Sequence, residues 1–392
     1  MISDRYRAEC GTLRILLNAT PLTGILTGIA RYTRTLYDAI LDLKLANVDF
    51  FVNGRASSKM PEQSNASVNE HFPAWIRDAA REIRLALLER RLNAMYSANS
   101  VDIYHETGMF PTSRSLTIPT VLTIYDLSLL KHGSYHPKDR VAHFRRHFFR
   151  RLNKVDRVIT LSYFVRDEIV GKLDFPPNKV TAIPLAPAKI FSRRSDSMVC
   201  RYLSDNKIAQ PFLLSVATNE PRKNLVGLIQ ALECTRSDNL LVLVGGSGWL
   251  NQDVVTQIKR EDIRRRIVRL GHVSDEELAL LYSGALALVY PSFYEGFGLP
   301  ILEAMACGCP VICSDRGAMA EVAGDAAYLV NPRDIPALAE ALEAVLADDS
   351  LRQSLVARGY KRCAEFSWEQ TAQKTVATFQ QVCRHRGTEF TG

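Results

Sequence analysis

The chain has 392 residues, of which 47% are hydrophobic, and a formal net charge of +7 at neutral pH. This length predicts about two or three domains with ordinary apolar cores. No apolar run approaches the roughly 20 residues that span a bilayer, and residues 1–11 lack the apolar segment of a secretory signal, so a cytoplasmic protein is predicted. Eight scattered cysteines without a C-x-x-C pair predict buried free thiols rather than a zinc site or disulfides.

The N-terminal half alternates between strand and helix patterns. A strand is predicted at 13–18, and after a loop with glycines a helix is predicted at 29–43. Further apolar runs predict strands at 48–52, 103–105, 120–125 and 157–161. A proline-bearing passage at 183–187 precedes a polar stretch, which predicts an interdomain linker at 189–210.

The C-terminal half repeats the alternation. Strands are predicted at 212–216, 240–245, 267–270, 285–290, 311–314 and 328–330, and helical stretches at 335–366 and 368–385. Such alternation favours an α/β fold with mainly parallel sheets. The two sets predict two doubly wound domains, at 1–188 and 211–370, with ligands bound at the carboxyl ends of the strands.

Two basic segments have apolar residues at helical spacing, Trp75–Arg91 and Lys138–Arg157. A basic amphipathic helix can lie on an anionic membrane surface, bind nucleic acid or simply be solvated. From these residues alone, a solvated surface helix is the favoured interpretation.

The segment Tyr294–Met305 carries two glutamates in a strand–loop–helix context. Glu295 is predicted in a loop with glycines, and Glu303 about two turns into a helix at 299–307. The free N–H groups of the helix start can hold an anion such as a diphosphate. Glu303 would lie deeper, where a ribose hydroxyl could bind. The alternative is a capped surface helix with two solvated glutamates.

The segment Glu295–Val311 resembles the signature E-G-F-G-L-P-x-L-E-A-M-A-x-G-x-P-V of the retaining, nucleotide-sugar-dependent glycosyltransferases of family four. The resemblance implies the GT-B architecture, in which two Rossmann-like domains face a cleft and a final helix, here about 371–392, packs back on the N-terminal domain. It implies that Glu295 binds sugar hydroxyls and Glu303 the ribose. Further donor contacts are implied for Gly296, Phe297, Gly298 and Leu299.

Two phosphate-binding motifs are implied next. Thr27 and Gly28 lie between the first strand and its helix, where the family places a glycine-rich loop against the donor. Arg222 and Lys223 resemble the Arg and Lys of the family's G-T-L-E-P-R-K-N segment, which bind the nucleotide diphosphate. Many relatives carry another arginine where this chain has Thr218.

Four further candidates lie at strand ends. In the family's T-I-H-D-L segment this chain has Tyr125 in place of the His, whereas Asp126 matches the family's Asp, so Tyr125 can orient the sugar by a hydrogen bond but offers no imidazole. Val273 is the candidate for binding the nucleobase. His105 ends a predicted strand and is a candidate for facing the acceptor.

The sequence therefore predicts a retaining hexosyltransferase that moves mannose from GDP-mannose to a lipid-linked or growing glycan acceptor. The choice of mannose rests on resemblance to bacterial mannosyltransferases of O-antigen and exopolysaccharide assembly. No D-x-D pair occurs, so no metal or cofactor is expected apart from the donor itself. Membrane contact through the basic helices is expected, and nucleic-acid binding is not. A UDP-sugar-dependent enzyme, a GT-B epimerase and a non-catalytic scaffold are the alternatives.

Overall fold

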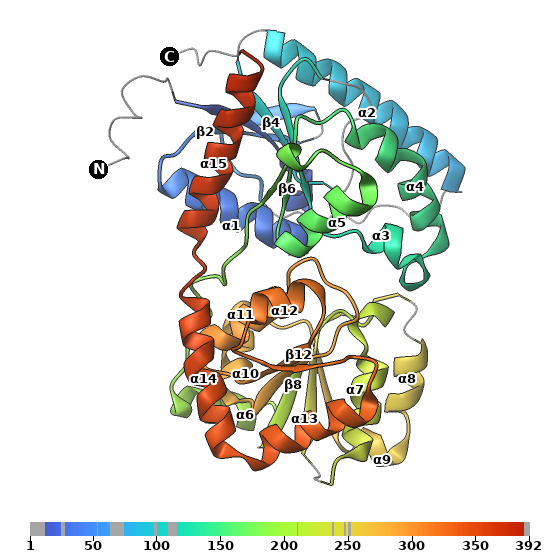
Figure 1. Ribbon diagram of the computed structural model, residues 1–392, viewed down its shortest axis with the longest axis vertical. Helices are drawn as coiled ribbons and strands as arrows, with labels where there is room; N and C mark the ends of the chain where they lie inside the picture. Colours follow the sequence, from blue (N-terminus) through green and yellow to red (C-terminus); the bar gives the residue numbers. More distant parts are fainter. Residues whose placement is uncertain are drawn as a thin grey trace.

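The computed structural model describes residues 12–24, 28–52, 54–62, 74–97, 100–108, 116–209, 211–236, 239–246, 248–249 and 252–387. These residues form two α/β domains, drawn one above the other in Figure 1. Each domain is built on one sheet that is covered by helices on both faces. The predicted α/β fold with two doubly wound domains is confirmed.

The N-terminal sheet has seven strands in the order β3-β2-β1-β4-β5-β6-β7. All neighbours pair in parallel except β3, which is antiparallel to β2. The central strands are buried along their whole length, as expected for parallel strands between two helical layers. Their bounds are β1 Arg14–Asn18, β2 Asn47–Val52, β3 Arg55–Ser57, β4 Ile103–Glu106, β5 Thr120–Ile124, β6 Arg157–Thr160 and β7 Val180–Ala182.

The helices of this domain connect successive strands. They are α1 Gly28–Asp42, α2 Ala74–Ser97, α3 Ser128–Lys131, α4 Lys138–Leu152 and α5 Tyr163–Leu173, with short 3-10 turns η1 Thr20–Thr23, η2 Gly133–Tyr135 and η3 Pro177–Lys179. Ser162 caps α5 by accepting a hydrogen bond from the backbone N–H of Val165 at 3.2 Å. None of the described helices is long and apolar enough to cross a membrane.

The C-terminal sheet has six strands, all parallel, in the order β10-β9-β8-β11-β12-β13. Their bounds are β8 Phe212–Val216, β9 Leu240–Val244, β10 Ile267–Gly271, β11 Ala287–Tyr290, β12 Val311–Ser314 and β13 Tyr328–Val330. The covering helices are α6 Asp196–Asp205, η4 Pro221–Lys223, α7 Leu225–Cys234, α8 Gln252–Ile258, α9 Glu261–Arg264, α10 Asp275–Gly284, α11 Leu299–Ala306, α12 Gly317–Ala323, α13 Ile335–Ala347 and α14 Asp349–Cys363.

The last helix, α15 Trp368–His385, crosses from the second domain to the first (Figure 1). It lies against α1, and the Arg386 guanidinium that follows it donates to Asp156 at 2.8 Å. Trp368 and Phe379 of α15 belong to an apolar core that continues through both domains. The domains are therefore joined by a packed core as well as by the chain itself.

Three details differ from the sequence predictions. The expected linker at 189–210 contains helix α6, because Val199 and Leu203 are buried and α6 packs against α10. The single helical stretch expected at 335–366 is two helices, since Asp348 ends α13 and caps α14 with its own carboxylate. All seven cysteines in the described part of the chain are free, but Cys200 and Cys234 are exposed rather than buried.

Candidate active site

A cavity of about 500 Å³ lies between the two domains, at the carboxyl ends of the strands. Residues from both domains line it, and the carboxyl ends of the strands are where open α/β sheets bind their ligands. The predicted site residues that it brings together are Gly28, Tyr125, Asp126, Arg222, Lys223, Val273, Glu295, Gly296, Phe297, Gly298, Leu299 and Glu303. Thr27 lies outside the described residues.

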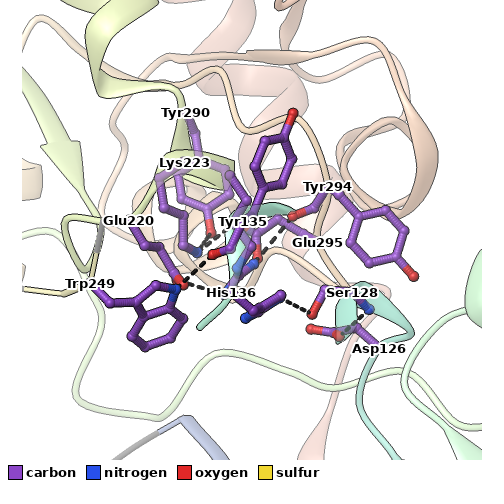
Figure 2. A network of polar contacts seen from close by, with 11 residues as sticks. Asp126, Ser128, Tyr135, His136, Glu220, Lys223, Trp249, Tyr290, Tyr294 and Glu295 are labelled. Atoms are coloured by element: carbon purple, nitrogen blue, oxygen red, sulfur yellow. Dashed lines mark hydrogen bonds and ion pairs between the residues drawn. The ribbon is translucent and has the colours of Figure 1, made fainter. Parts of the chain in front are cut away.

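A buried ion-pair cluster lines this cavity, and Figure 2 shows its residues Glu220, Lys223 and Glu295. The Lys223 ammonium donates to Glu295 Oε1 at 2.6 Å and to the Tyr290 hydroxyl at 3.1 Å. The Arg222 guanidinium donates to Glu295 Oε2 at 2.5 Å and pairs with Glu220 Oε1 at 2.9 Å. Two cations and two carboxylates thus balance one another within the cluster.

The cluster shifts the titration of its members. Burial opposes ionisation of Glu295, but the charges of Arg222 and Lys223 outweigh it and lower the pKa of that carboxyl to about 2. Burial and the neighbouring Arg222 lower the pKa of the Lys223 ammonium, although Glu295 works in the opposite direction. Glu295 is therefore ionised at neutral pH and fixes the position of both cations.

The loop after Glu295 passes very close to the N-terminal domain. A Cβ on Gly296 would meet the backbone oxygen of Tyr125 at 1.9 Å, so only glycine fits there. Gly298 has φ of 103°, a left-handed conformation, and it is the N-cap of α11. The positive end of the α11 dipole therefore faces the cavity, where it can stabilise an anion.

Glu303 is the fifth residue of α11, about one turn from its start rather than the predicted two. Its carboxylate accepts hydrogen bonds from Arg31 of α1 at 3.2 Å and from the Tyr282 hydroxyl at 3.2 Å. Arg31 also pairs with Asp275 of α10 at 2.6 Å. Burial raises the pKa of Glu303 to about 7, and the charge of Arg31 limits the rise. This carboxyl therefore titrates near neutral pH.

Tyr125 and Asp126 lie at the end of β5. The Tyr125 hydroxyl donates to the backbone oxygen of Thr107 at 2.9 Å, and its ring meets the ring of Tyr32 edge-on at 5.4 Å. Asp126 accepts a hydrogen bond from the Ser128 N–H at 2.8 Å. Tyr125 therefore shapes the cavity wall, while its hydroxyl is engaged within the N-terminal domain.

His105 does not line the cavity, and this placement corrects the expectation that it faces an acceptor. It is fully buried, with Nδ1 at 2.7 Å from the Tyr37 hydroxyl and Nε2 at 2.8 Å from Thr123 Oγ1. Burial lowers the pKa of this imidazole to about 3. His105 is a neutral, fully paired core residue of β4, and Phe379 of α15 packs against its ring at 5.0 Å.

Several hydrogen bonds hold the two walls of the cavity together. The Tyr294 hydroxyl donates to Glu168 Oε2 at 2.7 Å and accepts from the Leu127 N–H at 3.0 Å. The Ser162 hydroxyl donates to the backbone oxygen of Gly296 at 2.8 Å. Tyr294, which precedes Glu295, is therefore hydrogen-bonded directly to Leu127, which follows Asp126.

Four residues of this site were not identified from the sequence: Arg31, Glu220, Tyr290 and Tyr294. Arg31 lies three positions after Gly28, and Glu220 lies two positions before Arg222, both of which were predicted. Tyr290 ends strand β11 and Tyr294 directly precedes Glu295. Proximity to a motif was a usable signal, but the partners of Arg31, Tyr290 and Tyr294 come from distant parts of the chain.

Two doubly wound domains that face a cavity, with a cation pair and a helix start at its centre, define the GT-B class of glycosyltransferases. A family model described as "Glycosyl transferases group 1" matches residues 204–362, and one described as "Glycosyltransferase Family 4" matches residues 26–186. The O-antigen chain mannosyltransferase B of Escherichia coli is 34% identical over 94% of this chain and all of its own length.

A second relative and a solved structure are also similar to this chain. The O-antigen chain mannosyltransferase RfbU of Salmonella typhimurium is 27% identical over 82% of this chain and 87% of its own length. The structure of a sucrose-phosphate synthase from Thermosynechococcus elongatus superposes with a TM-score of 0.74 over 96% of this chain and 100% of that chain, at 21% identity, and supports the fold. The chain belongs to the group 1, family four glycosyltransferases, and it is a glycosyltransferase.

Proposed function

We propose that this enzyme transfers mannose from GDP-mannose, with retention of configuration, to a lipid-linked or growing glycan of a bacterial surface polysaccharide such as O-antigen. The observation that carries the choice of sugar is the similarity along nearly the whole chain to an O-antigen chain mannosyltransferase. The second mannosyltransferase relative supports the same choice.

The geometry supports a mechanism in which the chain's own cations stabilise the leaving group. Arg222, Lys223 and the start of α11 would bind the diphosphate, and Glu295 would bind hydroxyls of the transferred sugar. The bond between the sugar C1 and the phosphate oxygen breaks as the acceptor hydroxyl oxygen bonds to C1 on the same face. The departing phosphate oxygen takes the acceptor's proton. Preorganised cations stabilise the charge that develops on that phosphate.

A thermal-shift screen tests this proposal directly. The purified protein would be melted alone and with GDP, UDP, ADP, GDP-mannose or UDP-glucose, because a ligand that binds only the native state raises Tm by mass action. We expect stabilisation by GDP and GDP-mannose only. Stabilisation by the uridine compounds would replace mannose by another sugar, and no stabilisation by any nucleotide would favour a scaffold.

The role proposed for Glu303 has a pH signature. With a pKa of about 7, the ionised fraction of this carboxyl rises from about one tenth at pH 6 to about nine tenths at pH 8. An ionised carboxylate is the better acceptor for ribose hydroxyls, so the affinity for GDP should rise by up to about ninefold over this range. Isothermal titration of GDP measures the change.

The matched control is Glu303→Gln, because GDP's own phosphate also titrates over this range and does so equally for both proteins. The affinity for GDP should therefore rise more between pH 6 and pH 8 in the wild-type protein than in Glu303→Gln. Equal gains for the two proteins would remove Glu303 from the nucleotide site.

Peripheral membrane contact through α2 and α4 is part of the proposal. The apolar side chains of Ile83, Leu87 and Phe149 are 64%, 55% and 46% exposed. Exposed Arg145 and Arg146 precede Phe149 on α4. Figure 1 draws both helices on the N-terminal domain, on the side away from α15. Apolar side chains flanked by cations are typical of helices that lie in an anionic lipid surface.

Sedimentation with vesicles of phosphatidylcholine and phosphatidylglycerol tests this contact. Phe149→Asp and Ile83→Asp should each lower the bound fraction severalfold. Met198→Asp, at a 53% exposed position of α6, is the control and should leave binding unchanged. Equal sedimentation of all four proteins would contradict the contact.

A further inference from the structure

One wall of the cavity is formed by residues that have no part in the donor machinery described above. Ser128 of α3, His136 after η2 and Arg140 of α4 come from the N-terminal domain, and Trp249 comes from the C-terminal domain. Figure 2 shows His136 between Trp249 on one side and Ser128, which lies next to Asp126, on the other. The cavity therefore continues beyond the diphosphate-binding cations.

His136 lines this part of the cavity and has one unpaired ring nitrogen. Its side chain is 6% exposed, and Nε2 lies 3.0 Å from Ser128 Oγ. Its other ring nitrogen, Nδ1, is buried and has no hydrogen-bond partner among the described residues. Buried polar atoms are nearly always paired in folded proteins, so an unpaired one at a cavity wall indicates a partner that arrives from outside the chain.

Trp249 closes this wall without competing for that partner. Its Nε1 donates to the backbone oxygen of Tyr135 at 2.6 Å, so its only polar atom is used within the protein. Its ring lies 5.7 Å from the His136 ring, and the Arg140 guanidinium lies 5.3 Å from the ring centroid. The tryptophan thus holds the two domains together beside His136, and its own polar atom does not compete for a partner of Nδ1.

The chemistry of the corner favours a neutral hydroxyl group. Burial lowers the pKa of His136 to about 4, so the imidazole is uncharged near pH 7 and can either donate or accept. Glu220, which is also buried in the cavity wall, has its Oε2 without a partner among the described residues. A carboxylate oxygen and a neutral imidazole nitrogen are both suited to hydrogen-bond sugar hydroxyls.

We propose that this corner is the acceptor subsite, and that His136 Nδ1 hydrogen-bonds a hydroxyl of the acceptor's terminal pyranose. The inference rests on the proposed glycosyl transfer and deepens it, because it assigns the acceptor end of the cavity and the chemical class that enters there. The connected contacts from Asp126 through Ser128 to His136 position the imidazole. Its rotation is therefore restricted before the acceptor arrives.

Two substitutions at His136 test the roles of its two ring nitrogens separately. His136→Gln places an amide near the position of Nε2, which keeps the contact with Ser128 but removes the group at Nδ1. His136→Asn places its amide near the position of Nδ1. The acceptor probe is whichever of octyl α-mannoside, octyl β-N-acetylglucosaminide and octyl β-galactoside the wild-type enzyme glycosylates fastest.

We expect His136→Gln to raise KM for that octyl glycoside by about tenfold, the loss typical of one hydrogen bond to a buried group. His136→Asn should raise it by no more than about threefold, because it keeps a hydrogen-bonding group at the critical position. The Kd for GDP, measured by isothermal titration, should stay within about twofold for both variants. The control is His385→Gln, at an exposed position of α15.

An unchanged acceptor KM in His136→Gln would overturn the assignment, and so would a raised Kd for GDP with an unchanged acceptor KM. Equal losses in the two variants would also overturn it, because they would show a general packing role. These outcomes differ from failure of the proposed function, in which the wild-type protein itself would bind no nucleotide and glycosylate no octyl glycoside.

Discussion

Lys223→Ala should lower kcat/KM for sugar transfer by about a thousandfold while the protein stays folded, because a preorganised buried cation is lost from the leaving group. The Lys223 ammonium is about nine-tenths buried and held by Glu295 at 2.6 Å and Tyr290 at 3.1 Å. Its position is therefore fixed before the donor binds, and no reorganisation is needed as charge develops on the departing phosphate. Arg222 still pairs with Glu295 in the variant, at 2.5 Å, so the loop should keep its conformation.

The measurement is a transfer assay with GDP release as readout, together with thermal melting. Lys259→Ala is the matched control, since Lys259 is exposed at the end of α8 in the same domain. The control should retain wild-type kcat/KM. A folded Lys223→Ala enzyme with wild-type kcat/KM would remove Lys223 from the diphosphate site.

Glu295→Gln should have the second largest effect, and it should lower both the free energy of unfolding and the rate of sugar transfer. Without a ligand, Glu295 neutralises both Arg222 and Lys223, which leaves Glu220 as their remaining paired carboxylate in the variant. Breaking a buried ion pair costs about 3 kcal/mol in the free energy of unfolding. Transfer should fall at least about a hundredfold, because the sugar loses its carboxylate partner.

GDP should stabilise the Glu295→Gln variant more than it stabilises the wild-type protein. In the wild-type protein the diphosphate must compete with Glu295 for the two cations, whereas in Glu295→Gln it replaces a missing negative charge. We expect GDP to raise the Tm of the variant by more degrees than that of the wild type. A smaller shift, combined with an unchanged Tm of the free protein, would contradict the counter-charge role of Glu295.

The pH dependence of stability gives an independent check on Glu295. Its pKa is about 2 in the folded protein against 4.5 for an ordinary glutamate. The stabilisation is therefore fully present above about pH 4.5 and is lost as the pH falls towards 2. Glu295→Gln should show a shallower loss of stability over this window in urea titrations.

Most of the fold could be predicted because its signals are local. Strands β8, β12 and β13 and helix α15 have the predicted bounds, since apolar runs ended by proline, glycine or polar residues need no distant partner. The strands β3 and β7 were missed, because β3 is exposed at every residue and β7 has one buried residue, so neither has an apolar pattern. Helix α6 was missed because only its packing against α10 buries the side chains of Val199 and Leu203.

The sequence by itself determined the class of the two domains and the loops that carry the chemistry, through the motifs around Arg222, Lys223 and Glu295. Only the tertiary structure decided which side chains meet. Glu295 pairs with cations 72 and 73 positions away, and Arg31 reaches Glu303 across 272 positions. The same long-range packing buried His105 in the core and placed His136 at the cavity. Local periodicity reports backbone geometry and burial, whereas ion pairs and cavity walls depend on how the two domains dock, which no local pattern encodes.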